Sequence, residues 1–377
     1  MSAGLLAQSQ AERGHKVVAM CGSPALVEVR EQQNGVTVIR VPHHNLFWHE
    51  DFRSQSKIKI AASKIMEGIN FRYAAAFSKI MCEFKPDIVH THSLVALTPL
   101  IWREARKNGA RVVHSVRDYD LMCTRSTRVR AGQFCESRCW SCKVLTSTKS
   151  SHDRHVDAVV GISSDVLHRH LAEGYFPHVP QAHRHVVSNS VERAADFQFK
   201  ARNGPLKFGY IGRISPEKGL HILISACRQL DPGSWELSIA GKPPEDLDTV
   251  LPDRGNGMAV RWLGWMDSTA FLDRIDVLVM PSIWPEPFGR VTVEAFSRGV
   301  PVLGSRIGGT PELIGTDNPE WLFDPNDVTA LANAMRRIIT HGRPLSIPRQ
   351  RIADVLAATE PDRVARAYLN IYRHVLE

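Results

Sequence analysis

Two basic residues flank a glycine-rich turn in the second half of the chain, and their spacing suits phosphate binding. The segment Phe208-Gly-Tyr-Ile-Gly-Arg-Ile-Ser-Pro-Glu-Lys-Gly219 has the pattern of a strand, a turn and a helix start, with Arg213 and Lys218 at the ends of the turn. Backbone amides at a helix start and two cations together form a site for phosphate oxygens. The alternative is a loop whose basic side chains face water.

Two glutamates follow the end of a later strand. In Trp284-Pro-Glu-Pro-Phe-Gly-Arg-Val-Thr-Val-Glu294, the prolines and Gly289 predict a loop, and a helix then runs through Glu294. Ligands of doubly wound sheets bind at this carboxyl edge of the strands. A carboxylate accepts hydrogen bonds from vicinal hydroxyls, which suits a sugar or a ribose. The alternative is that Glu286 and Glu294 are surface charges.

Four of the seven cysteines lie in one segment, residues 123–142. Cys123, Cys135, Cys139 and Cys142 are separated by eleven, three and two residues. Four thiolates are enough for a structural zinc or an iron–sulfur centre, and the alternative is a set of buried cysteines in a long loop. The start of the chain shows no signal-peptide pattern, so we expect reduced thiols and a cytoplasmic location.

Short β-branched runs alternate with helical patterns along the whole chain, which predicts an α/β fold with parallel sheets. The expected strands form two series, covering residues 16–20, 36–41, 87–89, 111–115 and 158–162, then 206–211, 235–240, 260–263, 276–280 and 301–304. The expected helices include residues 57–83, 94–107, 219–229 and 290–298. Two series predict two doubly wound domains. We expect the boundary within residues 188–203, giving domains 1–192 and 193–358 and a last helix in 359–377.

The start of the chain departs from this pattern. A helical stretch over residues 5–13 ends at Gly14, and the first strand follows at Lys16. A doubly wound domain opens instead with a strand and a tight glycine-rich turn. We therefore expect the N-terminal strand and its loop to be missing, and a segment of roughly twenty residues to belong upstream.

Composition narrows the class of protein. The 377 residues are 43% apolar and 23% charged, which excludes a disordered chain and a small disulfide scaffold. Of the net charge of +8, residues 1–190 carry +9 (25 Lys and Arg against 16 Asp and Glu) and the remainder −1. Such a basic half suits a phosphorylated substrate or an anionic membrane as well as simple solubility. No aromatic and basic recognition motif is present, so we expect no nucleic-acid partner.

The order and spacing of several motifs resemble the donor half of retaining glycosyltransferases of family 4. These motifs are Gly212-Arg213 through Lys218-Gly219, Glu286-Pro-Phe-Gly289 with Glu294, Gly299-Val-Pro-Val302 and Ile307-Gly-Gly-Thr-Pro-Glu312. Two further segments resemble strand ends of the acceptor half: Pro86-Asp-Ile-Val-His-Thr-His92 and Arg117-Asp-Tyr-Asp-Leu-Met-Cys123. The resemblance runs from about Leu5 to the C-terminus.

The resemblance implies the GT-B architecture, in which two Rossmann-like domains face across a cleft and the last helix crosses back to the first domain. It implies sugar transfer with retention from a nucleotide-diphosphate-sugar to a glycan or lipid-linked acceptor, with no cofactor or metal required for catalysis. Arg213 and Lys218 would neutralise the leaving diphosphate, which lowers the barrier to transfer. Glu286 would hold sugar hydroxyls and Glu294 the ribose. The implied donor-binding residues are Gly212, Phe288, Gly289 and Glu294.

On the acceptor side the resemblance implies roles for His92, His114, Arg117 and Asp118. The family often has a histidine directly before this aspartate, where this chain has Arg117. An arginine stays protonated and cannot act as a general base. We expect it to bind a phosphate or an anionic sugar instead. We also expect His90 and His92 to point to opposite faces of their strand, one toward the cleft.

A basic helical pattern over residues 57–79 follows the aromatic loop Asn45-Leu-Phe-Trp48. It predicts peripheral contact with an anionic membrane at its inner face, where a lipid-linked acceptor would lie; a solvated helix is the alternative. We expect a role in surface polysaccharide or glycolipid biosynthesis. Other hypotheses are an epimerase or phosphorylase of the same fold, and an N-terminally truncated, catalytically impaired remnant that binds nucleotide only.

Overall fold

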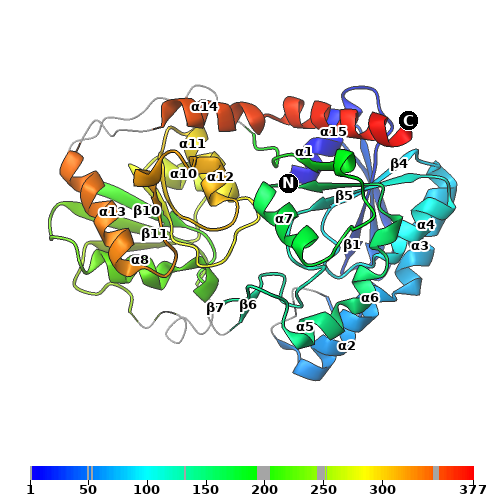
Figure 1. Cartoon of the computed structure of the whole chain (residues 1–377), viewed down its shortest axis with the longest axis horizontal. Coiled ribbons are helices and arrows are strands. Elements are labelled where there is room, and N and C mark those ends of the chain that lie inside the picture. The colour runs from blue at the N-terminus through cyan, green and yellow to red at the C-terminus, as the bar shows by residue number, and fades with distance from the viewer. Residues whose placement is uncertain are drawn as a thin grey trace. The chain divides into compact units, whose positions relative to one another are not determined.

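The computed structural model describes residues 2–48, 51, 54–130, 133–192, 204–243, 251, 253–342 and 348–377. The chain forms two compact units, drawn in Figure 1. Unit 1 comprises Met1–Arg128, Cys135–Ser190 and Pro361–Glu377, and unit 2 comprises Val129–Phe134 and Val191–Glu360. The units divide between Ser190 and Val191. Residues 193–203 of the expected boundary segment, 188–203, lie outside the described residues.

The described strands of unit 1 form two separate sheets. One has the order β1 (Val18–Ser23), β3 (Val36–Pro42) and β2 (Val29–Gln33), with β1 parallel and β2 antiparallel to β3. The other is fully parallel, in the order β4 (Ile88–Thr91), β5 (Arg111–Val116), β8 (Ala158–Gly161) and β9 (Arg184–Val186). Within the described chain, β1 and β4 are edge strands and no strand joins them.

One predicted helix of unit 1 is divided in the structure. Residues 57–83 form α2 (Lys57–Gly68) and α3 (Phe71–Phe84) rather than one helix. The break has a local cause, because the Asn70 side chain accepts a 3.1 Å hydrogen bond from the Tyr73 amide and so caps α3. The remaining helices before unit 2 are α1 (Ser2–Ala11), α4 (Leu100–Lys107), α5 (Trp140–Leu145), α6 (Ser147–Ser150) and α7 (Ser164–Ala172).

The last helix of the chain, α15 (Pro361–Leu376), completes the core of unit 1. It packs beside α1 and against β5 (Figure 1). Its apolar residues recur at helical spacing and meet side chains of α1, β5 and β8 in one buried cluster. The cluster contains Leu6, Val113, Ala158, Val160, Val364, Ala365, Tyr368, Ile371 and Val375.

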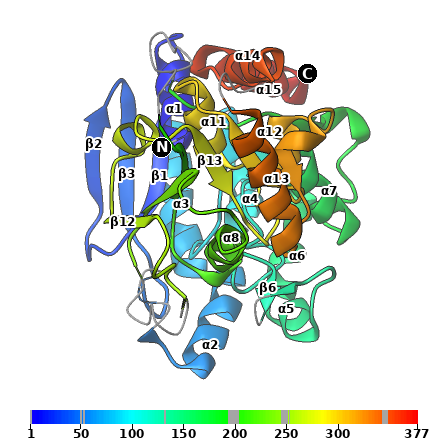
Figure 2. The same cartoon turned by 90° about the vertical axis from the view of Figure 1, so that its left-hand side faces the viewer.

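Unit 2 is built on one parallel six-stranded sheet. Its order is β12 (Val260–Gly264), β11 (Trp235–Ala240), β10 (Leu206–Ile211), β13 (Val277–Met280), β14 (Val302–Ser305) and β15 (Leu322–Phe323). Its helices include α8 (Leu220–Cys227), α10 (Ser268–Leu272), α11 (Arg290–Ser297), α12 (Thr310–Ile314), α13 (Val328–His341) and α14 (Arg349–Ala358). Helices α8 and α13 lie side by side, as Figure 2 also shows. A hairpin of β6 (Val129–Arg130) and β7 (Gln133–Phe134) also belongs to this unit.

Both units therefore have the α/β class predicted from the sequence, with helices connecting parallel strands. No described helix combines the length and the apolarity that crossing a bilayer requires.

Candidate active site

The two predicted motifs of unit 2 meet at one edge of its sheet. Strands β10 and β13 are parallel neighbours, so the turn after Ile211 and the loop after Met280 leave the sheet on the same side. Residues 281–289 of that loop are buried throughout. The topology thus brings together residues that are almost seventy positions apart in the sequence.

Lys218 and Glu286 form the centre of this site. The Lys218 ammonium lies 2.8 Å from Glu286 Oε1, and both side chains are largely buried. The Ser282 hydroxyl donates a short hydrogen bond to the same carboxylate oxygen. The ammonium also lies 5.6 Å from the centre of the Trp284 ring, within cation–π range. Ser282 therefore holds the carboxylate of the pair, and Trp284 contacts its ammonium group.

The charge of Lys218 keeps Glu286 ionised. Burial by itself raises the pKa of this carboxyl, but the Lys218 charge and hydrogen bond outweigh it, helped by Ser282 and by the charge of Arg213. The net result is a pKa below the ordinary value of 4.5. Glu286 is thus a buried carboxylate that can accept hydrogen bonds from a ligand.

Gly308, in the loop after β14, allows the Glu286 backbone to approach closely. A Cβ atom at Gly308 would lie 2.5 Å from the Glu286 nitrogen and 2.6 Å from its oxygen. The backbone of Gly308 also has a φ of 66°, which favours glycine. The next amide, of Gly309, donates a 2.8 Å hydrogen bond to the Glu286 carbonyl. The loop after β14 therefore fixes the position of the Glu286 backbone.

The other predicted residues of unit 2 surround this pair. Arg213 is 64% exposed and lies 3.6 Å from Glu217, so its guanidinium is open to a ligand. Glu294, on α11, forms a 2.7 Å ion pair with Arg290. Phe288 is buried, and Gly289 takes a left-handed φ of 85° immediately before α11 begins. Gly212 directly follows β10. Of the predicted set, the structure joins Lys218 and Glu286 directly.

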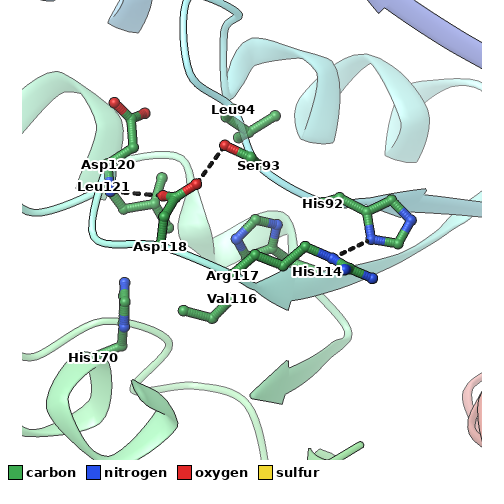
Figure 3. A pocket seen from close by; sticks show the side chains of 10 residues that line it. All are labelled: His92, Ser93, Leu94, His114, Val116, Arg117, Asp118, Asp120, Leu121 and His170. Carbon is green, nitrogen blue, oxygen red and sulfur yellow. Dashed lines mark hydrogen bonds between the residues drawn. The ribbon is translucent and has the colours of Figure 1, made fainter. Parts of the chain in front are cut away.

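A second group of predicted residues lines a pocket inside unit 1 (Figure 3). It lies at the carboxyl ends of β4 and β5, and α7 supplies one wall. All four predicted acceptor-side residues take part. The lining residues are His92, Ser93, Leu94, His114, Val116, Arg117, Asp118, Asp120, Leu121 and His170.

Arg117 reaches across this pocket to neutral partners. Its Nε donates a 2.9 Å hydrogen bond to His92 Nδ1, and its Nη1 donates a short one to Asn189. The neighbouring Asp118 is turned elsewhere: it accepts a 2.5 Å bond from the Ser93 hydroxyl and a 2.8 Å bond from the Asp120 amide. Figure 3 shows the two side chains directed to different partners.

The expectation that His90 and His92 lie on opposite faces is wrong. Their ring centres are 4.1 Å apart. Side chains of a strand alternate residue by residue, so positions two apart share a face. His90 bonds Tyr372 (2.6 Å) and Ser115 (2.7 Å), which ties β4 and β5 to α15.

The histidines of the pocket are neutral. Burial lowers the pKa of His114 to about 3, with smaller contributions from the charges of His170 and Arg117. Burial also places the pKa of His92 well below 6.5, followed by the effects of His90 and Arg117. Asp118 has a raised pKa, first because of burial and then because of the Asp120 charge.

Asp120, which lines the pocket, belongs to a group of four buried charges that no sequence pattern indicated. Lys149 Nζ lies 2.6 Å from both Asp120 Oδ2 and Glu67 Oε2. Lys64 Nζ lies 3.2 Å from Asp120 Oδ1 and 3.0 Å from Glu67 Oε1. All four side chains are at most 6% exposed, so each charge is balanced inside the fold. This square ties α2 and α6 to the loop that carries Arg117 and Asp118.

The cysteine segment brings two sulfurs together. The Cys142 thiol hydrogen-bonds the Cys123 sulfur, which also accepts from the amides of Arg125, Thr127 and Arg128, and these bonds lower the pKa of Cys123 to about 6. Among the described residues, no group of three or more metal-ligand side chains has a metal-binding arrangement. The predicted metal at Cys123, Cys135, Cys139 and Cys142 therefore stays a prediction.

Two other residues of the sites were not anticipated. Ser282 stands four residues before Glu286, and its place after a buried strand was the available signal. Asn189, which holds Arg117, lies 72 positions from it and follows β9, where no local pattern marked it.

The two α/β units, each containing a parallel sheet, have the architecture of GT-B glycosyltransferases. A family model described as glycosyl transferase 4-like domain matches residues 2–190, and one described as glycosyl transferases group 1 matches residues 191–353. The chain belongs to this family of glycosyltransferases, as its motifs predicted.

The chain is similar to individual proteins over most or part of its length. An uncharacterised 42.6 kDa protein in the cps region of Klebsiella pneumoniae is 29% identical over 88% of this chain and 87% of its own. A putative colanic acid biosynthesis glycosyltransferase of Escherichia coli is 33% identical over 36% of each chain.

Two solved structures share the fold. Sucrose-phosphate synthase of Thermosynechococcus elongatus has a TM-score of 0.72 at 18% identity, covering 98% of this chain and 91% of its own. HepE of Anabaena, in complex with UDP, has a TM-score of 0.69 at 17% identity, covering 99% and 95%.

Proposed function

We propose that this glycosyltransferase transfers a sugar, with retention at the anomeric carbon, from a nucleoside-diphosphate sugar to a glycan or lipid-linked acceptor of surface polysaccharide biosynthesis. The observation that carries the proposal is the buried Lys218–Glu286 pair at the edge of β10 and β13. Two similar proteins support the proposal. The Anabaena protein forms a complex with UDP-glucose, and the Escherichia coli relative is described as a putative glycosyltransferase of colanic acid biosynthesis.

Each residue of the pair has a distinct part in this proposal. When a donor binds, Lys218 and the exposed Arg213 turn to the diphosphate oxygens, where negative charge grows as the sugar leaves. Glu286 is then free to accept hydrogen bonds from the sugar hydroxyls. Glu294 holds the ribose hydroxyls, and the amides near Phe288 and Gly289 add donors. The positive charge at the diphosphate comes from side chains, so the proposed transfer needs no metal.

A transfer assay with matched variants tests this proposal. Nucleoside-diphosphate sugars are screened for thermal stabilisation of the protein, because a ligand of the folded state raises its stability. The anomeric configuration of the product is then read by NMR. Lys218→Ala should lower kcat/KM by about a hundredfold or more, as loss of a charge-stabilising donor does. Lys207→Ala, at the opposite end of β10, is the control. Inversion at the anomeric carbon, or equal activity of both variants, would contradict the proposal.

The acceptor side of the proposal rests on an exposed surface of unit 1. Ile58 on α2 is 83% exposed and Trp140 on the neighbouring α5 is 78% exposed. The lysines at positions 57, 59 and 143 are exposed on the same two helices. Apolar side chains among basic ones suit an anionic membrane surface, where a lipid-linked acceptor is found. We propose that this surface contacts such a membrane.

Vesicle sedimentation tests the membrane contact. The protein should bind vesicles of phosphatidylglycerol and not those of phosphatidylcholine. Trp140→Ser should weaken the binding severalfold, while Trp265→Ser serves as a control because Trp265 is also 78% exposed but lies in unit 2. An equal loss of vesicle binding in the two variants would indicate nonspecific hydrophobic adsorption and contradict the proposed surface.

A further inference from the structure

The Arg117 pocket of unit 1 has an ionic feature that the proposed transfer does not use. Arg117 is a half-buried cation whose hydrogen-bond acceptors, His92 and Asn189, are uncharged. The Tyr368 hydroxyl, a further partner close to Arg117, is also uncharged. Among the described residues, no carboxylate forms an ion pair with Arg117. A partly buried charge that forms no ion pair is costly, and such groups are normally paired.

The nearest carboxylates are committed to other partners. Asp118 uses its two oxygens on Ser93 and on the Asp120 amide. Asp120 is held by both Lys64 and Lys149, and burial, which alone would raise its pKa, is outweighed by these two ammonium groups. The four charges of that square sum to zero. The Asp118 charge raises the pKa of Arg117, but the hydrogen bonds of its oxygens go to Ser93 and Asp120 rather than to the guanidinium.

Beside the carboxylates of Asp118 and Asp120, whose oxygens already accept hydrogen bonds, the pocket offers N–H donors to a ligand. A guanidinium has five N–H groups, and the three contacts named above leave others for a ligand. His92 is neutral and accepts from Arg117 through Nδ1, which assigns its proton to Nε2. His92 Nε2 makes no hydrogen bond to a described residue. Arg117 and His92 therefore present N–H groups from the same edge of the sheet.

We propose that Arg117 and His92 bind an anionic group, with phosphate or carboxylate oxygens, carried by a substrate of unit 1. Arg117 supplies the charge and a geometry that matches two oxygens of one anion. His92 adds a directed N–H and holds the guanidinium in place. That this substrate is the acceptor rests on the proposed function, whereas the binding of an anion in the pocket does not. The enzyme would thereby select charged over neutral substrates.

The test uses NMR on the whole chain and follows the ring signals of His92. Because His92 lies in unit 1, these signals report on the pocket and not on anions that bind unit 2. The signals are assigned with a His92→Gln variant. Inorganic phosphate and glucuronate are the two anionic probes, and glucose is the neutral one. We expect a saturable shift of the His92 signals with at least one anion and none with glucose. A shift with phosphate alone identifies a phosphate group, and a shift with glucuronate alone identifies a sugar carboxylate.

Substitutions at Arg117 complete the test. In Arg117→Gln the dissociation constant for the anion should rise by about tenfold or more, because a charge-assisted bond is lost. Arg117→Lys should restore part of it, and Arg72→Gln, an exposed arginine on α3, should leave it unchanged. In the absence of any anion, Arg117→Gln should also raise the pKa of His92, since the Arg117 charge lowers it.

The inference is overturned if neither anion shifts the His92 signals of the native protein, if glucose shifts them equally, or if Arg117→Gln binds the anion as tightly. These outcomes do not depend on sugar transfer. Failure of the donor assay with Lys218→Ala would overturn the proposed function and leave the anion site standing.

Discussion

At the scale of single residues, the donor site separates two glutamates that look alike in sequence. Glu286 is buried and bound to Lys218, whereas Glu294 lies on α11 and pairs with Arg290. We propose that the two carboxylates serve different parts of one donor, the sugar for Glu286 and the ribose for Glu294. The two carboxylates have different cationic partners, which is the difference that the proposed division of roles builds on.

We predict that Glu294→Ala weakens binding of the free nucleoside diphosphate by about tenfold, since hydrogen bonds to the ribose are lost. Glu286→Gln should bind the same nucleotide nearly as well and lose most of its transfer activity. Calorimetry with nucleotide and a transfer assay measure the two effects. If both variants lose only nucleotide affinity, the division of roles is wrong.

The buried His114 makes stability depend on pH in a defined direction. Its pKa is about 3 in the folded protein and near 6.5 when exposed, so between these values the unfolded chain binds the extra proton. The free energy of unfolding should therefore fall as pH decreases from 6.5 toward 3. His114 alone accounts for up to about 1.4 kcal/mol per pH unit in that range.

Urea unfolding at several pH values measures this effect. The slope should become smaller in His114→Gln and stay as it is in His15→Gln, where an exposed histidine is replaced. An unchanged slope in the first variant would mean that His114 takes up its proton in the folded state.

At the scale of elements, the square of buried charges fixes the loop after β5. Lys149 belongs to the short α6, and its removal leaves Asp120 and Glu67 buried with Lys64 as their remaining cation. We predict that Lys149→Met lowers the free energy of unfolding by about 3–5 kcal/mol. Lys143→Met, at an exposed position of α5, should change it little. Adding Glu67→Leu to the first variant should recover part of the loss, and no recovery would mean that the charges are not coupled.

The cysteine segment, residues 123–142, is a second element, and its predicted metal content can be measured. We predict one structural metal ion per chain, because four thiolates within residues 123–142 match the ligand number of structural zinc. Elemental analysis of protein purified without chelator decides the matter. Less than about a tenth of an equivalent of zinc or iron would contradict the prediction, given the single ion of a four-thiolate site.

The sequence predicted elements well where the signal was local. The turn after residue 211 and the loop before Gly289 are marked by glycine and proline, and parallel strands then bring Lys218 and Glu286 together. The division of residues 57–83 was missed because the apolar pattern continues across it, and Asn70 was the single capping signal. In the charge square Lys64 and Glu67 are three positions apart on one helix, but the other three pairs join positions 29 to 82 apart. Pairing at that longer range depends on packing that no spacing rule contains.

At the scale of the whole molecule, unit 1 needs the C-terminal helix α15 for its core, whereas unit 2 is built from segments that precede this helix. Tyr368, on α15, is 1% exposed in the core of unit 1. We predict that Tyr368→Ala lowers the free energy of unfolding of unit 1 by about 3–5 kcal/mol, because it leaves a large cavity in the core. Hydrogen exchange should then speed up in β5 and β8 and stay unchanged in β10 and β13. A loss of protection in both units would show that they unfold together.

The place of α15 also has a consequence for how the protein is made. The ribosome completes β5 and β8 long before it reaches the helix that covers them, because the 170 residues from Val191 to Glu360 are synthesised in between. At a bacterial or eukaryotic rate of about 5–20 residues per second, that wait lasts roughly 10–35 s. Unit 2 can fold meanwhile, whereas the apolar strip around Val113 and Val160 stays open to chaperones and to neighbouring nascent chains. The unit whose strands are translated before unit 2 is therefore completed after it.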